Sequence, residues 1–191
     1  MNAARAGART FVALALGAEL GPRVAARVEW ALAGADFRLP EGSGLHLTLA
    51  FLGEVARARL GPFVEELARA LAGAAAPELR LVATGAFPSF ARARVLWAGI
   101  EERGAPGRLA ACRAAVLAGL ARAGFEGELE RFTPHVTVAR PRGRARVPEA
   151  FAELHFGLDW DPAEVALFES RRDPAGSRYE VLARFALVPS G

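Results

Sequence analysis

Two short segments of this chain share one pattern of alternating polar and apolar residues. Residues 45–50 read LHLTLA and residues 134–139 read PHVTVA, so His135 follows His46 by 89 positions. Strict alternation over so short a stretch is typical of a strand with one buried face. A long period with two copies indicates a duplicated lobe, because a solenoid needs at least three stacked units. We therefore expect two lobes, each built around one copy of the segment.

The polar residues of each segment fall on one side of the expected strand. Successive side chains of a strand point to opposite faces, so His46 and Thr48 share one face. His135 and Thr137 share a face in the second copy for the same reason. The intervening leucines and valines would then be buried on the other face. If a pseudo-twofold axis relates the lobes, the four polar side chains converge on one cleft.

Periodicity and chain breakers predict an α+β fold in which one order of elements occurs twice. The expected strands cover residues 10–16, 45–52, 79–85, 94–100, 130–139, 164–169 and 179–187, and the expected helices cover 20–33, 58–72, a stretch ending near 123, and 148–154. We expect a two-lobed, duplicated β-α-β-α-β-β arrangement with mostly antiparallel sheets flanking a central cleft. The 191 residues then form a single domain with lobes at approximately 10–100 and 105–190.

Composition excludes several kinds of chemistry. All 24 basic residues are arginine, which removes the phosphate-binding lysine loop, the lysine Schiff base and the adenylylated lysine. The lone Cys112, expected to be a buried small apolar residue, excludes internal disulfides and zinc sites built on cysteine pairs. Its isolation suits a reducing cytoplasm. The apolar run at 11–18 is too short to cross a membrane, so we expect a cytoplasmic protein without membrane association.

Two histidines with neighbouring hydroxyls suit acid-base chemistry at a phosphate without a metal. One neutral imidazole can accept a proton from an attacking water, while the other, charged, protonates the departing oxygen. One His-x-Thr on a strand is more often structural, but two matched copies favour a catalytic role. His155 lacks a threonine partner and is interpreted as structural or solvent-facing, with a three-histidine zinc site as the competing interpretation. No histidine pair has helical ligand spacing, so we expect no metal and no cofactor.

Five segments of the chain carry a family resemblance. They are residues 9–13 (RTFVA), 46–54 (HLTLAFLGE), 94–100 (RVLWAGI), 131–140 (RFTPHVTVAR) and 170–179. In these segments the chain resembles the 2H phosphoesterases, and among them the RNA 2′,3′-cyclic phosphodiesterases, also called 2′-5′ RNA ligases. The resemblance implies two α+β lobes flanking a cleft. It also implies hydrolysis of a terminal 2′,3′-cyclic phosphate of RNA to a 2′-phosphomonoester, with reversible 2′-5′ ligation as a side activity.

The resemblance also implies roles for particular residues. His46 and His135 take the catalytic positions, while Thr48 and Thr137 take phosphate-binding positions. We assign the acid to His46 and the base to His135, an order that the pseudo-symmetry could equally reverse. No metal ligand is implied.

Arg140 matches the arginine that contacts phosphate in this family. Strict alternation would place Arg140 on the face opposite His135. We therefore expect Pro141 to end the strand, so that a twist or turn lets the long arginine side chain reach back.

Aromatic and basic residues near the two motifs are candidate RNA contacts. They are Phe51, Phe90 and Phe132, which could stack a base, and Arg142 in the arginine-rich stretch 131–146. Aromatic residues beside a strand are more often core, and such an arginine run is often a solvated loop, so both interpretations stay open. The expected partner is RNA with 2′,3′-cyclic phosphate ends, transfer RNA fragments among them, and we expect a monomer. The alternative function is a non-catalytic RNA-end binding protein that uses the same cleft.

Overall fold

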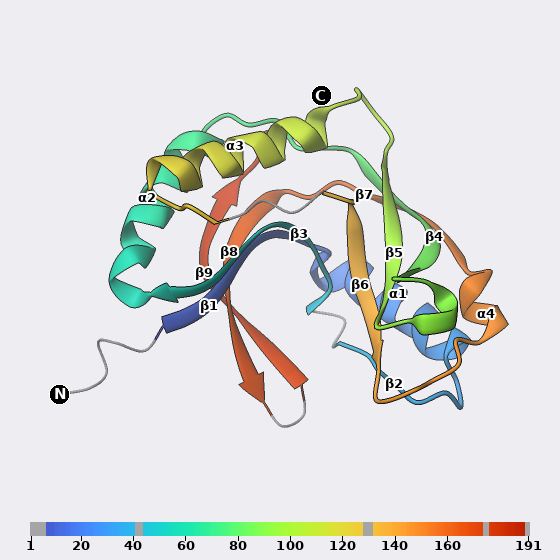
Figure 1. The fold of residues 1–191 in the computed structure, drawn as a ribbon. Coiled ribbons are helices and arrows are strands. Elements are labelled where there is room, and N and C mark those ends of the chain that lie inside the picture. The colour runs from blue at the N-terminus through green and yellow to red at the C-terminus, as the bar shows by residue number, and fades with distance from the viewer. Residues whose placement is uncertain (1–6, 41–43, 128–131, 174–175, 190–191) are drawn as a thin grey trace.

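The structure is a computed structural model, and it describes residues 7–40, 44–127, 132–173 and 176–189 (Figure 1). Its strands are β1 (Gly7–Ala15), β2 (Phe37–Arg38), β3 (His46–Ala56), β4 (Leu79–Phe87), β5 (Val95–Glu102), β6 (His135–Pro141), β7 (His155–Trp160), β8 (Glu164–Asp173) and β9 (Gly176–Ala186). Its α-helices are α1 (Gly17–Ala31), α2 (Leu60–Leu71), α3 (Arg108–Arg122) and α4 (Glu149–Ala152). No helix in the described part of the chain combines the length and the apolar character that a membrane span needs.

The strands form a single curved sheet in the order β7-β4-β5-β6-β3-β1-β8-β9, and β2 pairs with β6 beside this path. Each pairing between these strands is antiparallel. Figure 1 shows the sheet bent into an arch with β6 on one side and β1, β8 and β9 on the other. The expected antiparallel α+β fold is confirmed, with the difference that one continuous sheet replaces two separate ones.

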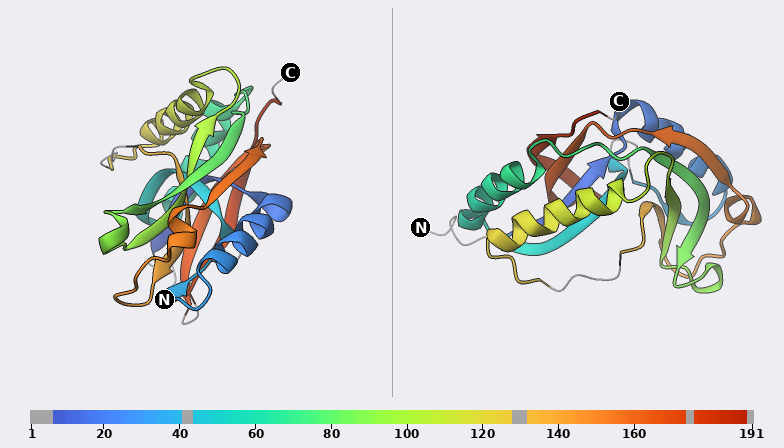
Figure 2. Two further views of the ribbon diagram at one scale, coloured as in Figure 1. Left: turned by 90° about the vertical axis from the view of Figure 1, so that its right-hand side faces the viewer. Right: turned by 90° about the horizontal axis from the view of Figure 1, so that it is seen from above.

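The two halves of the arch do not coincide with the two halves of the chain. On one side of the β3–β6 pairing lie β1, β8 and β9, and on the other lie β4, β5 and β7. Each half therefore mixes strands from before and after residue 105, so the contiguous lobes expected at 10–100 and 105–190 do not describe it. The helices cross over in the same way, because α1 contacts β6 whereas α3 contacts β3. In Figures 1 and 2, α1 and α2 accordingly lie at opposite ends of the sheet.

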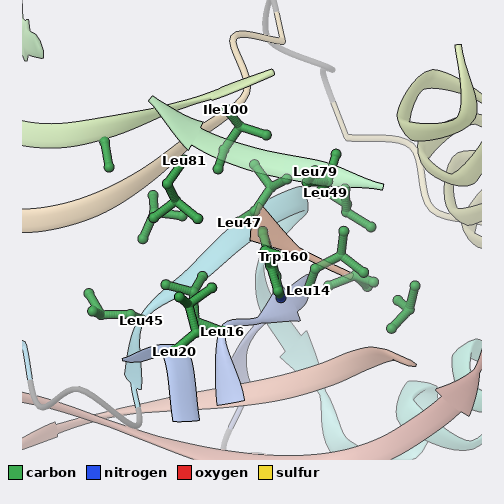
Figure 3. Packing of buried hydrophobic residues seen from close by; sticks show 14 of the residues in the cluster. Leu14, Leu16, Leu20, Leu45, Leu47, Leu49, Leu79, Leu81, Ile100 and Trp160 are labelled. Atoms are coloured by element: carbon green, nitrogen blue, oxygen red, sulfur yellow. The ribbon is translucent and has the colours of Figure 1, made fainter. Parts of the chain in front are cut away.

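One face of the sheet and all four helices share a continuous hydrophobic core. Alternate residues of β3 and Leu45, just before it, point into this core, and Figure 3 shows Leu45, Leu47 and Leu49 among leucines from other strands and from α1. The buried positions of α1 recur at helical spacing, as in Leu20, Val24 and Val28, which is why this segment packs on the sheet as a helix. None of the helices in the described ranges lies on the opposite face, on the inner side of the arch, and this face holds the polar residues of both motifs.

Candidate active site

Strands β3 and β6 are neighbours at the centre of the sheet, and their pairing brings the two motifs together. The register pairs Leu47 with Val136, which are the middle residues of the two His-x-Thr triplets. Both are buried on the helix side, so their neighbours project from the inner face. Continuing the antiparallel register by one residue in each direction places the four polar side chains around this pair, with His46 opposite Thr137 and Thr48 opposite His135.

A β-bulge follows the motif in β6 and determines where Arg140 points. Thr137 pairs with one residue of β5 and Ala139 pairs with the next, so Val138 is an extra residue in β6. Val138 and Ala139 are both buried, as expected where a bulge interrupts the alternation, and Arg140 is exposed. The bulge thus returns Arg140 to the face of Thr137. Pro141 is the last residue of β6, but the bulge and not the proline reverses the side-chain direction, which corrects the expected cause.

The same bulge occurs at the same position of the first motif. Thr48 and Ala50 of β3 pair with consecutive residues of β1, so Leu49 is the extra residue. Leu49 and Ala50 are both buried, and Phe51 is 51% exposed. Phe51 therefore occupies in β3 the place that Arg140 occupies in β6, and it lies on the face of the catalytic candidates.

Aromatic side chains surround His46 on the inner face. Its ring stacks on Phe11 of β1, with centroids 4.6 Å apart, and meets the edge of Tyr179 of β9 at 5.1 Å. Burial among these rings lowers the pKa of His46 to about 4, against the opposing effect of a hydrogen bond to the Gly44 carbonyl, and the charge of His135 lowers it further. His46 is therefore neutral near pH 7.

The two imidazoles are oriented by equivalent hydrogen bonds. Nδ1 of His46 lies 2.6 Å from the carbonyl oxygen of Gly44, and Nδ1 of His135 lies 2.7 Å from that of Thr133. A carbonyl oxygen only accepts, so Nδ1 carries the hydrogen in both rings. Each neutral imidazole consequently has its unprotonated Nε2 available as a proton acceptor. Around His135 the rings are fewer, with the edge of Phe87 at 5.1 Å.

Arg113 of α3 connects the two motif segments and was not singled out by the sequence. Its Nε donates a hydrogen bond of 3.1 Å to the carbonyl of Leu49, the bulge residue of β3. Its guanidinium also lies over the ring of Phe132, 4.4 Å from the centroid, three residues before His135. In the sequence this residue resembles any arginine on the surface of a helix. The bulge to which it donates exists only in the folded backbone, so the sequence did not indicate the contact.

The remaining candidate contacts lie in different places. Phe90, 37% exposed, is in the turn between β4 and β5, whereas Phe132 is partly buried against the main core. Arg142 lies 3.7 Å from the carboxylate of Asp36, and Arg131 lies outside the described residues. The structure therefore places Phe51 on the motif face and packs Phe132 away from it.

Neither His155 nor Cys112 lies with the motif residues. His155 begins β7 at the edge of the sheet, three strands away from β6. Within the described ranges, no three histidine, cysteine, aspartate or glutamate side chains gather as a metal site would require. Cys112 is buried in α3, and burial raises the pKa of its thiol to about 11.

Comparison with known proteins gives consistent matches over most of the chain. Residues 22–174 match the family described as the 2′-5′ RNA ligase superfamily. An RNA 2′,3′-cyclic phosphodiesterase of Thermus thermophilus is 38% identical over 147 residues, or 75% of this chain and 72% of the relative. One from Thermotoga maritima is 30% identical over 182 residues, or 91% of this chain and 92% of the relative.

Two further comparisons concern length and fold. The chain spans 45% of the length of a Geobacillus stearothermophilus protein that is also named RNA 2′,3′-cyclic phosphodiesterase and is 32% identical over 146 residues, or 75% of this chain. The crystal structure of E. coli LigT complexed with 3′-AMP superposes with a TM-score of 0.75 at 27% identity, covering 95% of this chain and 98% of that one.

Proposed function

The chain belongs to the 2′-5′ RNA ligase superfamily and is a 2H phosphoesterase, and we propose that it hydrolyses terminal 2′,3′-cyclic phosphates of RNA to 2′-phosphomonoesters. The observation that carries this proposal is the pairing of the two motifs across β3 and β6, with both Nδ1 atoms hydrogen-bonded to carbonyls. At a single phosphate, one proton leaves the attacking water and another reaches the departing oxygen, and two Nε2 atoms on one face can carry out these two transfers. Relatives that are 38% and 30% identical to this chain carry the name RNA 2′,3′-cyclic phosphodiesterase.

The environments of the two imidazoles support opposite roles for them. His46, with a pKa of about 4, is the neutral imidazole and suits the base. Its Nε2 accepts a proton from the attacking water, whose oxygen bonds to phosphorus. The bond from phosphorus to the 3′ oxygen breaks, and the proton of a charged His135 Nε2 goes to that oxygen. This assignment reverses the order expected from the sequence.

The remaining motif residues have the chemistry to stabilise the charged phosphate. The hydroxyls of Thr48 and Thr137 are donors for its nonbridging oxygens, and the guanidinium of Arg140 supplies positive charge on the same face. Phe51, exposed beside them, suits stacking of the terminal base. The chain contains no lysine, so 2′-5′ ligation would proceed only as the reverse transesterification and not through an adenylylated enzyme.

Substituting each histidine distinguishes this enzyme from a protein that only binds RNA ends. We expect His46→Ala and His135→Ala to lower kcat by about 10²–10⁴-fold on a short RNA with a 2′,3′-cyclic phosphate, because each loses one proton transfer. His155→Ala, which removes a histidine outside the site, is the matched control and should retain the parent rate. Parent-like turnover by either motif variant would refute the mechanism. RNA binding without any turnover by the parent would favour the end-binding alternative.

The identity of the RNA, the oligomeric state and the compartment remain predictions. We infer transfer RNA fragments as substrates because they carry the required terminal group. The predictions of a monomer and of a cytoplasmic location rest on the sequence alone. Size-exclusion chromatography with light scattering tests the first of these two.

A further inference from the structure

We propose that Arg38, which lies beside Arg140, binds the phosphodiester that precedes the terminal nucleotide, so that the enzyme prefers an oligonucleotide to a cyclic mononucleotide. This inference rests on the proposed function and adds a second phosphate site to it. Arg38 belongs to β2, an element of two residues that the sequence did not indicate.

The register of β2 places the two arginines side by side. Arg38 pairs directly with Arg140, and Phe37 pairs with Pro141. Side chains that face one another across an antiparallel pair project from the same face, with Cβ atoms about 5 Å apart. Phe37 is buried and anchors β2, while Arg38 is exposed on the other face. Because the bulge in β6 turns Arg140 to the motif face, Arg38 lies on that face as well.

The described residues supply no partner for the charge of this arginine pair. Like charges directly opposite on neighbouring strands are destabilising. Within residues 7–40, 44–127, 132–173 and 176–189, neither guanidinium has a hydrogen bond or an ion pair. The nearby carboxylate of Asp36 lies with Arg142 instead, at 3.7 Å. The phosphates of an RNA strand bound along the two guanidinium groups would offset the repulsion, and phosphate oxygens match their donor geometry.

The position of Arg38 beside β6 indicates which phosphate it takes. Arg140 lies three residues beyond Thr137, which is about 7–10 Å along a strand that contains one bulge residue. Arg38 lies on the far side of Arg140 from β5, outside the group of motif side chains. A reacting phosphate held by Thr48, Thr137 and Arg140 therefore leaves Arg38 free for the next phosphate of the same RNA strand.

Comparing two substrates tests this second site. The substrates are adenosine 2′,3′-cyclic phosphate, which has one phosphate, and the adenylyl dinucleotide that ends in a 2′,3′-cyclic phosphate, which has two. We expect Arg38→Ala to lower kcat/KM at least tenfold on the dinucleotide and less than twofold on the mononucleotide. The slope of log kcat/KM against log salt should also become shallower on the dinucleotide only, by about 0.7.

The matched control is Arg23→Ala, which removes an exposed arginine of α1 and should change neither rate. An unchanged mononucleotide rate also shows that Arg38→Ala is folded. Equal losses on both substrates would overturn the proposal by placing Arg38 at the reacting phosphate, and parent-like rates on both would overturn it outright. Failure of the parent to turn over either substrate would instead refute the proposed function.

Discussion

Replacing His46 by asparagine should remove a specific part of the acid sensitivity of this protein's stability. The folded state holds the pKa of His46 at about 4, whereas an unfolded chain gives histidine its ordinary value near 6.5. At pH 7.5 the imidazole is neutral in both states and contributes no difference. As the pH falls below 6.5, the unfolded state binds the proton first, so the folded state loses stability until the pH reaches about 4.

The size of this effect follows from the two pKa values. One pKa unit corresponds to about 1.4 kcal/mol. With a pKa of 6.5 in the unfolded state and about 4 in the folded state, His46 costs the folded state about 2 kcal/mol of stability on going from pH 7.5 to pH 5. With a urea m-value of about 2 kcal/mol/M, the unfolding midpoint should fall by about 1 M more in the parent than in His46→Asn. Asparagine retains an N–H donor for the Gly44 carbonyl, which limits other changes.

Urea unfolding at both pH values, followed by circular dichroism, measures the difference. Groups that titrate in parent and variant alike cancel when the two pH dependences are subtracted. His155→Asn, an exposed histidine outside the site, is the control and should lose as much stability as the parent. If His46→Asn loses as much stability between pH 7.5 and pH 5 as the parent does, His46 is not held neutral by burial, and its assignment as the base fails.

Three further outcomes follow from the same geometry. The acid limb of kcat/KM should lie near pH 4 instead of near 6.5, the ordinary pKa of histidine, because His46 must be neutral to accept a proton. A pH-rate profile with a cyclic mononucleotide measures this limb. Gly85→Ala should destabilise the protein by about 1–3 kcal/mol in urea unfolding, because a Cβ there overlaps the Trp97 ring. Arg113→Met should lower kcat about tenfold at an unchanged KM, because Arg113 holds the β3 bulge and Phe132 without facing the substrate.

Each of these outcomes has its own control. An acid limb near 6.5 in the parent would contradict the role given to the buried imidazole. Gly143→Ala, where a Cβ meets nothing within 4 Å, should leave stability unchanged, and equal effects at both glycines would refute the packing argument. Arg122→Met removes an exposed arginine of the same helix, whose one side-chain partner among the described residues is Glu66. Equal kcat values for this variant and Arg113→Met would show that the contacts of Arg113 have no effect on catalysis.

The sequence was most informative where local alternation decides the structure. The two His-x-Thr segments predicted both central strands and the faces of their histidines, because the side-chain period of a strand needs no tertiary information. The alternation of residues 155–160 (HFGLDW) is equally regular and buries every second residue in β7, yet this strand was not predicted. Because the predicted helix over 148–154 ends just before it, His155 was interpreted as a residue that follows a helix and not as the start of a strand.

The features that the sequence did not predict depend on contacts between distant segments. The bulges at Leu49 and Val138 exist only relative to their partner strands, so the direction of Arg140 could not follow from strict alternation. The pairings of β1 with β8 and of β4 with β7 mix the halves of the chain and leave no local trace. The aromatic side chains that bury His46 come from β1 and β9, more than thirty residues away in either direction.

In the proposed mechanism two histidines open a cyclic phosphate without a metal. The most direct test incubates the purified protein with a short RNA that ends in a 2′,3′-cyclic phosphate, in excess EDTA, and follows the products by phosphorus NMR. The chemical shift separates the 2′-phosphomonoester from the 3′ isomer, and we expect the 2′ isomer at the same rate with and without EDTA. Turnover that stops in EDTA and returns with added zinc would contradict the claim, as would a 3′-phosphate product.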